Sequence, residues 1–296
     1  MSDVRTKSTD RIAGRRVVVS VSGGKDSAAT SLYLKELGIE HDRVFADTGW
    51  EHPLTYEYLR GPLTDALGPI AEVRGEMTLP ELARKKGIFP SRRTRYCTEL
   101  LKVLPLKRYL QSFDEDIVNA IGIRGEESAD RAKMTEWEWS DAYDCETWRP
   151  IIAWKLEDVI AIHKRHGLAP NPLYLLGADR VGCFPCINAG RAELLLMARI
   201  APERIDEIRA LEHDVTDRAR EIVTARGERL LHPRSLFRER LPGFTTDIDG
   251  QMAWAKSNEQ DKYASQADVG CVRWGMCEAP MTKEEGEQMA FSFDAA

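Results

Sequence analysis

The sequence lacks the features of membrane and secreted proteins. No apolar run approaches the roughly 20 residues that a membrane-spanning helix needs, and residues 1–16 are polar and charged, without the apolar segment of a secretory signal. Six cysteines among 296 residues are too few and too unevenly placed for a disulfide scaffold. We therefore expect a cytoplasmic protein that does not associate with membranes.

An excess of positive charge is also lacking. The net charge of −6 argues against a protein that coats nucleic acid non-specifically. Two local basic regions contrast with this balance. The first is compatible with contacts to nucleic-acid phosphates, with a solvated face, or with an anion clamp for a small nucleotide. The two regions are Arg84, Lys85, Lys86, Arg92, Arg93, Arg95, Lys102, Lys107 and Arg108, and then Arg226, Arg229, Arg234, Arg238 and Arg240.

Three short apolar runs, each followed by a polar loop, predict strands of a parallel sheet. The run at 15–21 is β-branched without polar alternation, which is typical of a strand buried on both faces. Residues 28–37 have the pattern of a helix that faces a sheet. The strands and the loops after them are 15–21 with 22–27, 44–46 with 47–49, and 117–123 with 124–128. Because the carboxyl ends of parallel strands line the ligand crevice, we expect the three loops to converge.

The pattern becomes mostly helical beyond about residue 150. A helix is expected at 156–166, and apolar residues recur at helical spacing between Ile205 and Ile222, which predicts one packing face. We therefore expect a nucleotide-binding domain at 1–150 and a helical, cysteine-bearing region at 151–296. The predicted fold class is α/β, with a doubly wound, mostly parallel sheet.

The loop at 22–27 has the composition of a phosphate-binding turn. Its two glycines let backbone donors approach a polyphosphate without a Cβ in the way, and the N-terminus of the following helix favours bound phosphate. Lys25 adds a mobile charge, and Asp26 can hold Mg²⁺. The loop fits neither the Walker A pattern nor the dinucleotide-binding pattern. It consists of Ser22, Gly23, Gly24, Lys25, Asp26 and Ser27.

This loop resembles the signature of the phosphoadenylyl-sulfate (PAPS) reductase family of PP-loop nucleotide hydrolases. Asp47-Thr48-Gly49, Gly122 to Arg131, Pro150 to Trp154, and Asn171 to Cys186 resemble further stretches of that family, in order, over about residues 15–190. Ordered agreement across several loops is more specific than any one motif. The resemblance implies an adenine nucleotide alpha hydrolase-like fold and a nucleotide held by the loop residues 22–27 together with Asp47, Thr48, Gly49, Gly122, Arg124 and Glu127.

The cysteines form two candidate pairs, a C-x2-C of Cys183 and Cys186 and a looser pair of Cys271 and Cys277. Four thiolates can hold Zn²⁺ or a [4Fe–4S] cluster, and spacing alone does not decide between them. The resemblance favours the cluster, with Cys97, Cys183, Cys186 and Cys277 as ligands, Cys271 as the alternative fourth ligand, and Zn²⁺ as the alternative metal. The family's adjacent cysteine pair is missing here, because Tyr96 and Thr98 flank the cysteine between them.

The chain departs from the family's reductases at its C-terminus, which lacks the Glu-Cys-Gly-Leu-His segment that carries their nucleophilic cysteine. We therefore favour an enzyme that binds ATP with Mg²⁺, cleaves it at the α-phosphate, and supports sulfur transfer to an acceptor, with nucleic acid as one candidate. The residues expected to act in catalysis are Lys25, Asp26, Asp47, Arg124 and Arg131, with Mg²⁺ held near Asp26 and Asp47.

Two other functions stay open from the sequence. One is reduction of PAPS or adenylyl sulfate, and the other is a non-catalytic nucleotide-sensing module. The sequence names neither a protein that donates sulfur or electrons nor the oligomeric state, so a donor partner and a homo-oligomer both stay open.

Overall fold

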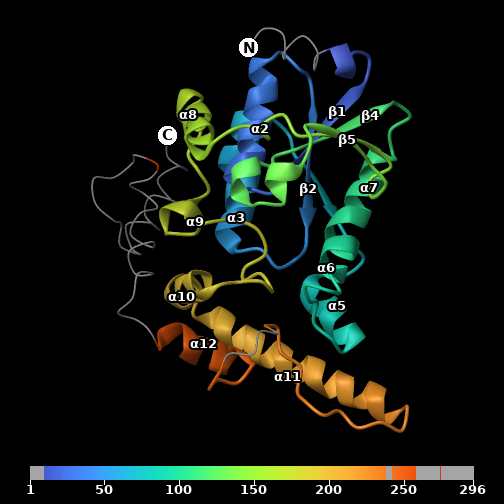
Figure 1. Ribbon diagram of the computed structural model, residues 1–296, viewed down its shortest axis with the longest axis vertical. Coiled ribbons are helices and arrows are strands. Elements are labelled where there is room, and N and C mark those ends of the chain that lie inside the picture. The colour runs from blue at the N-terminus through green and yellow to red at the C-terminus, as the bar shows by residue number, and fades with distance from the viewer. Residues whose placement is uncertain (1–9, 238–241, 258–273, 275–296) are drawn as a thin grey trace. The chain divides into compact units, whose positions relative to one another are not determined.

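The computed structural model describes residues 10–237, 242–257 and 274 (Figure 1). The strands are β1 (Arg16–Val21), β2 (Asp42–Asp47), β3 (Ala71–Arg74), β4 (Ile117–Ile121), β5 (Trp137–Ser140) and β6 (Cys145–Trp148). The longer helices are α2 (Lys25–Glu36), α5 (Leu79–Lys86), α7 (Leu104–Leu110), α8 (Leu156–Arg165), α10 (Arg191–Ile200), α11 (Glu203–Thr224) and α12 (Ile248–Lys256). The short helical segments are α3 (Pro53–Tyr58), η1 (Leu59–Leu63), α4 (Thr64–Leu67), α6 (Tyr96–Thr98), η2 (Glu99–Val103), η3 (Gly125–Glu127), η4 (Arg131–Lys133) and α9 (Pro172–Leu175).

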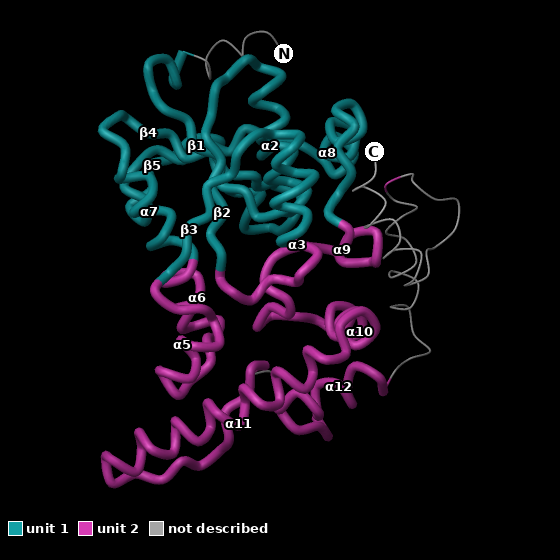
Figure 2. Tube along the Cα trace, turned by 180° about the vertical axis from the view of Figure 1, so that it is seen from behind, with its two compact units in different colours: residues 1–47, 56–75, 102–171 teal, residues 48–55, 76–101, 172–296 magenta. Residues whose placement is uncertain are grey.

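The chain forms two compact units, each made of segments that are not contiguous in sequence (Figure 2). Unit 1 comprises Met1–Asp47, Tyr56–Gly75 and Lys102–Asn171, and unit 2 comprises Thr48–Thr55, Glu76–Leu101 and Pro172–Ala296. This division differs from the single boundary near residue 150 that we expected. Two loop segments that leave the strands of unit 1 pack with the C-terminal helices, and a change in local sequence pattern does not record such long-range packing.

Unit 1 is built on a six-stranded sheet of order β3-β2-β1-β4-β6-β5. All neighbouring strands are parallel except β5, which is antiparallel to β6 at one edge. The chain continues from β1 to β2 and β3 on one side, and later to β4 and β6 on the other. The strand order thus reverses between β1 and β4, and in open parallel sheets this reversal places a ligand crevice at the carboxyl ends of the two strands.

Helices cover both faces of this sheet, with α2 and α8 on one side and α7 on the other (Figure 1). In β1, Val17, Val19 and Val21 belong to the core beside α2 and α8, and Val18 belongs to the core beside α7. Successive side chains of a strand point to opposite faces, and here both faces are buried, which explains the absence of polar alternation. The predicted α/β class and mostly parallel sheet are confirmed.

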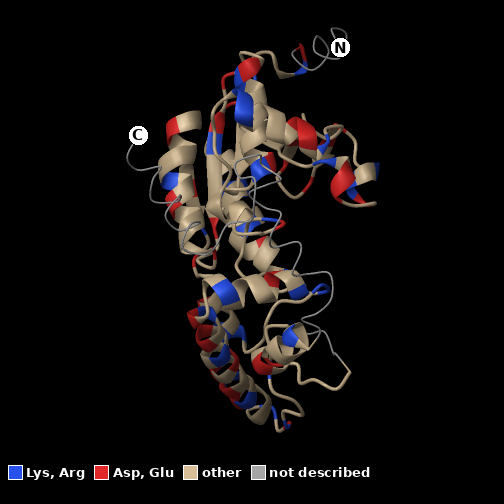
Figure 3. Ribbon diagram, turned by 90° about the vertical axis from the view of Figure 1, so that its left-hand side faces the viewer, with Lys and Arg blue, Asp and Glu red and all other residues tan. Residues whose placement is uncertain are grey.

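Unit 2 is mostly helical, and its core joins α5, α10, α11 and α12. Ile208, Leu211, Val215 and Ala219 of α11 are buried, which confirms the predicted packing face. Charged side chains crowd the rest of α11, the long helix at the bottom of Figure 3, and some form ion pairs one turn apart. Within the part of the chain that the structure describes, no helix is long and apolar enough to cross a membrane.

Candidate nucleotide site and cysteine region

The loop at 22–27 joins β1 to α2 at the reversal of strand order. Gly23 has a φ of 71°, a conformation that favours glycine, and Gly24 is the extended N-cap residue of α2. Both glycines are buried, Ser22 is exposed, and Lys25 and Asp26 are partly buried. No side chain caps the N-terminus of α2, so the positive end of the helix dipole is available to an anion there.

Four side chains hold the carbonyl oxygens of this loop. Asn171 Nδ2 donates to the Gly23 oxygen (3.2 Å), Ser27 Oγ to Gly24 (3.0 Å), His163 Nε2 to Lys25 (3.0 Å) and Thr30 Oγ1 to Asp26 (2.9 Å). In a trans peptide unit the C=O and N–H groups point in opposite directions. Each contact therefore turns the next amide N–H away from the donating side chain, and the loop conformation is fixed from behind.

His163 makes one of the two long-range contacts among these four. It is 1% exposed, and burial lowers the pKa of its imidazole below the ordinary value, so the ring is neutral at neutral pH. A carbonyl oxygen only accepts, so the Nε2–H tautomer is the one that donates to the loop. The ring thus positions the loop rather than adding positive charge.

The loop after β4 lies directly against the loop after β1. A Cβ placed on Gly122 would stand 2.5 Å from the Asp26 carbonyl oxygen and 2.7 Å from the Ser27 nitrogen. The two backbones approach so closely that only glycine fits at this position. The sequence-based expectation that these two loops converge is therefore met within unit 1.

Arg124 and Asp26 form a buried ion pair across the same contact. Arg124 is 4% exposed and also pairs with Glu126, at 2.7 Å. Burial disfavours its charge, yet the hydrogen bond and attraction from Asp26 keep the pKa of the guanidinium above its ordinary value. Lys25 Nζ lies 3.6 Å from the other Asp26 oxygen, so this carboxylate is held between two cations.

Glu127 and Arg131 stabilise the turn that follows β4. The Glu127 carboxylate accepts the Arg124 backbone N–H at 3.0 Å and pairs with Arg131 one turn later. Sequence reasoning assigned Glu127 to nucleotide binding and Arg131 to catalysis. In the structure the pair stabilises the conformation of the loop that carries Arg124.

Asp47 ends β2 in unit 1 and is 2% exposed. It accepts a hydrogen bond from Tyr56 Oη at 2.7 Å and from Arg74 Nε at 2.9 Å. Asp26 and Asp47, the predicted Mg²⁺ ligands, are thus each paired with an arginine. As arranged, the two carboxylates do not fit a Mg²⁺ site, because their charge is already balanced by side chains.

Thr48 and Gly49 belong to unit 2, where the predicted second loop continues. A buried carboxylate, that of Glu51, organises it by accepting from the Thr48 hydroxyl at 2.7 Å and the Trp50 amide at 3.2 Å. The Cys183 thiol donates to the same carboxylate at 3.9 Å. The loop and the first cysteine of the C-x2-C pair are therefore tied together within unit 2.

The cysteines are only partly accounted for. Cys97, Cys183 and Cys186 are partly buried, and Cys145 is buried. Among the residues that the structure describes, no three His, Cys, Asp or Glu side chains are grouped so that they could hold a metal ion. Cys97, Cys183 and Cys186 alone therefore do not fit a cluster, and Cys271 and Cys277 lie outside the described residues.

Several residues of the site escaped prediction from the sequence. Asn171 begins a stretch that resembled the family, so a motif marked it without revealing its role. His163 falls inside the helix expected at 156–166 with nothing that marks it, and nothing local marks Arg74 or Glu51. Their functions depend on contacts between segments that are far apart in the chain.

Comparison with known proteins gives a family match over the region of these loops. A family model described as the phosphoadenosine phosphosulfate reductase domain matches residues 16–189. An uncharacterised 37.8 kDa protein of Escherichia phage 186 is 35% identical over 248 residues, which cover 64% of this chain and 72% of the phage protein.

Adenosine 5'-phosphosulfate reductases are among the more distant relatives. The adenosine 5'-phosphosulfate reductase of Rhodococcus opacus is 31% identical over 150 residues, which cover 50% of this chain and 59% of that enzyme. The crystal structure of PAPS reductase from Candida auris, in a phosphate complex, matches with a TM-score of 0.47 and 18% identity, over 57% of this chain and 82% of that chain.

Proposed function

The chain belongs to the phosphoadenosine phosphosulfate reductase domain family, and from this premise we propose that it binds ATP or a related adenine nucleotide and cleaves it at the α-phosphate. The observation that carries the proposal is the fixed loop between β1 and α2. Its carbonyl oxygens are bound by Asn171, Ser27, His163 and Thr30, which leaves the amides oriented toward the uncapped helix N-terminus.

This arrangement suits a polyphosphate for electrostatic reasons. Peptide N–H groups and the helix dipole are fixed before the substrate arrives, so they need no reorganisation when charge develops. Lys25 lies at the start of the same helix, and its side chain is 12% exposed. Arg124 adds a second, permanently charged group from the neighbouring loop. We assign Asp26 the role of orienting these two cations.

The chemical step needs no covalent intermediate on the protein. An acceptor oxygen forms a bond to the α-phosphorus, the bond from that phosphorus to the bridging oxygen breaks, and pyrophosphate leaves with the electron pair. The loop donors and Lys25 stabilise the negative charge on the leaving group, and nucleotidyl transfer depends mainly on such positioning. The adenylated acceptor is then activated for replacement of its oxygen by sulfur.

Removal of the Lys25 charge is the direct test. We expect Lys25→Ala to lower pyrophosphate release from ATP by about 100-fold, the cost typical of losing one preorganised donor. Lys35→Ala is the matched control, because Lys35 lies exposed in the last turn of the same helix and should leave the rate within about twofold. Equal rates of pyrophosphate release in the two variants would show that the loop takes no part in the reaction.

Sulfonucleotide reduction is the second candidate, favoured by the similarity to the Rhodococcus opacus reductase. Thioredoxin-dependent release of sulfite from PAPS or adenylyl sulfate, without pyrophosphate release from ATP, would replace the first proposal with this one. Tight nucleotide binding without turnover of any of these compounds would instead identify a nucleotide-sensing module.

The iron–sulfur ligands stay a separate proposal, with Cys97, Cys183, Cys186 and Cys277 as the set and Zn²⁺ as the alternative metal. We expect iron and acid-labile sulfide in anaerobically purified protein, and loss of both in Cys183→Ser. Cys145→Ser is the control, because that thiol is buried in the core beside α7. A zinc-loaded, iron-free protein would exclude the cluster.

A further inference from the structure

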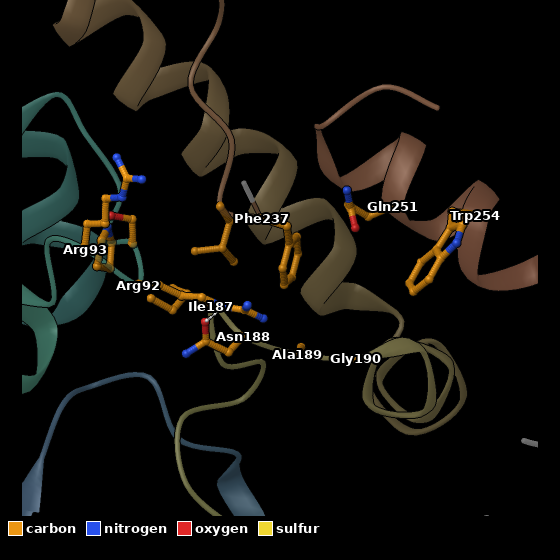
Figure 4. A pocket seen from close by; sticks show the side chains of 12 residues that line it. Arg92, Arg93, Ile187, Asn188, Ala189, Gly190, Phe237, Gln251 and Trp254 are labelled. Atoms are coloured by element: carbon orange, nitrogen blue, oxygen red, sulfur yellow. Dashed lines mark hydrogen bonds between the residues drawn. The ribbon is translucent and has the colours of Figure 1, made fainter. Parts of the chain in front are cut away.

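A pocket of about 390 Å³ lies wholly within unit 2 (Figure 4). None of its residues belongs to unit 1, which carries the loop at 22–27. Its lining comes from four parts of unit 2: the segment before α6, the segment between the C-x2-C pair and α10, the middle of the α11–α12 connection, and α12. The lining residues are Pro90, Ser91, Arg92, Arg93, Ile187, Asn188, Ala189, Gly190, Leu236, Phe237, Gln251 and Trp254.

The walls of this pocket combine aromatic rings with positive charge. Phe237 is 3% exposed, and it lines the pocket together with the Trp254 ring of α12 (Figure 4). Arg92 and Arg93 are exposed, and the lining within the described residues includes no acidic side chain. The lining therefore favours an anion that also carries an apolar or aromatic part.

One of the two arginines is oriented by the pocket itself. Arg92 Nε donates to Asn188 Oδ1 at 3.4 Å, and Figure 4 shows the side chain extending toward Asn188 while Arg93 points away from it. The Gln251 side chain, 3% exposed, adds an amide with both donor and acceptor groups. The pocket also reaches Gly190, the N-cap residue of α10, where no side chain caps the helix.

The physical character of the lining narrows the ligand class. A metal cation would meet arginines and no carboxylate from the described lining, and a purely apolar ligand would leave the guanidinium groups without a role. A small inorganic anion would not use the aromatic walls. The volume lies in the range of about 300–1,000 Å³ that is usual for small-molecule sites.

We propose that this pocket binds a nucleoside phosphate, with the base against Phe237 and Trp254 and the phosphate near Arg92 and Arg93. Aromatic side chains stack on any base because every base has a π-face, and arginines contact phosphate by charge. The inference rests on the proposed function and deepens it, because it names the acceptor as a nucleotide. A free nucleotide and a nucleotide residue of single-stranded nucleic acid both present this combination of a base and a phosphate.

The test compares two double variants that remove the same charge from unit 2. Arg92→Ala/Arg93→Ala removes the two arginine side chains that line the pocket. Arg218→Ala/Arg220→Ala removes two exposed arginines of α11 that lie outside it. Binding of a fluorescent short single-stranded oligothymidylate should weaken about tenfold or more in the first variant only. Its salt dependence should also fall, by about 0.7 in log–log slope for each phosphate that the variant no longer neutralises.

Trp254→Leu tests the stacking part separately, with thermal unfolding measured alongside. We expect at least about fivefold weaker binding when the base has no indole ring to stack on, at an unfolding temperature close to that of the parent protein. Competition by thymidine monophosphate at similar concentrations would identify a free nucleotide as the ligand, and its failure would identify a strand.

Two outcomes separate the failure of this inference from that of the proposed function. Equal weakening in the two arginine variants, or no weakening in either, would overturn the pocket assignment while ATP cleavage by the unaltered protein still stands. Absence of ATP binding and of pyrophosphate release in the unaltered protein would overturn the proposed function, whatever the oligothymidylate does.

Discussion

Gly122→Ala is expected to abolish measurable nucleotide binding at the loop between β1 and α2 while leaving most of the fold intact. The added Cβ would stand 2.5 Å from one backbone atom and 2.7 Å from another, both in the first turn of α2. Backbone cannot rotate aside as the end of a flexible side chain can, so one of the two loops must move. Overpacking of this kind typically costs about 1–3 kcal/mol of stability.

The functional loss should exceed the loss of stability. The Asp26 to Arg124 ion pair spans the same contact, so a shift of either loop separates Arg124 from the carboxylate that orients it. A displacement of about 1 Å at a reacting centre can cost about 100-fold in rate. We therefore expect ATP affinity and pyrophosphate release to fall by at least that factor.

The control for this variant is Gly61→Ala. Gly61 lies in a helical segment of the same unit, and a Cβ there would meet no atom within 4 Å. Isothermal titration calorimetry measures the ATP affinity of both variants, and thermal unfolding measures their stability. Undiminished ATP affinity in Gly122→Ala would show that the contact between the two loops does not shape the nucleotide site.

The central part of unit 1 could be predicted because its signals are local. The β-branched run, the glycine turn and the following helix formers lie within about 25 consecutive residues, and each has a structural reason that can be recognised in sequence. The short strands β3, β5 and β6 escaped prediction, and the two at the sheet edges, β3 and β5, combine partly exposed and charged residues. Strand order itself depends on which distant segments pair.

The arginine partners of the two predicted Mg²⁺ ligands show the same limit. Asp47 meets Arg74 at the end of a strand that the sequence did not predict, and Asp26 meets Arg124 from the loop after β4. A carboxylate in a glycine loop suggests metal binding when it is considered alone. Its neighbours in space decide whether its charge is already balanced, and those neighbours are set by the sheet topology.

Stability of unit 2 is expected to fall as pH rises from about 4.5 to about 7, because of one buried carboxyl group. Glu212 of α11 is 5% exposed, and its two oxygens accept the backbone N–H groups of Leu236 (2.9 Å) and Ile248 (3.0 Å). Burial raises its pKa to about 7 from the ordinary 4.5. The two backbone bonds oppose this rise, and Asp247 and Asp249 add to it.

The sign follows from the proton count. Between the two pKa values the unfolded chain loses its proton while the folded chain keeps it, so the folded state becomes less favourable as pH rises. The contribution is fully present below about pH 4.5 and is lost by about pH 7. The difference between the two pKa values corresponds to about 3 kcal/mol.

Glu212→Gln removes the titration but also replaces one acceptor oxygen with a donor. One of the two backbone N–H groups then lacks its acceptor, so the variant should be less stable than the parent at about pH 5, by about 1–3 kcal/mol. That deficit should shrink toward pH 7.5, because only the parent loses stability over the interval. Glu221→Gln, at an exposed position of the same helix, should give a pH-independent difference. Urea unfolding across this pH range measures the free energy of unfolding of each variant relative to the parent. If this difference did not change with pH for Glu212→Gln, the pKa of the buried carboxyl would be the same in the folded and unfolded states.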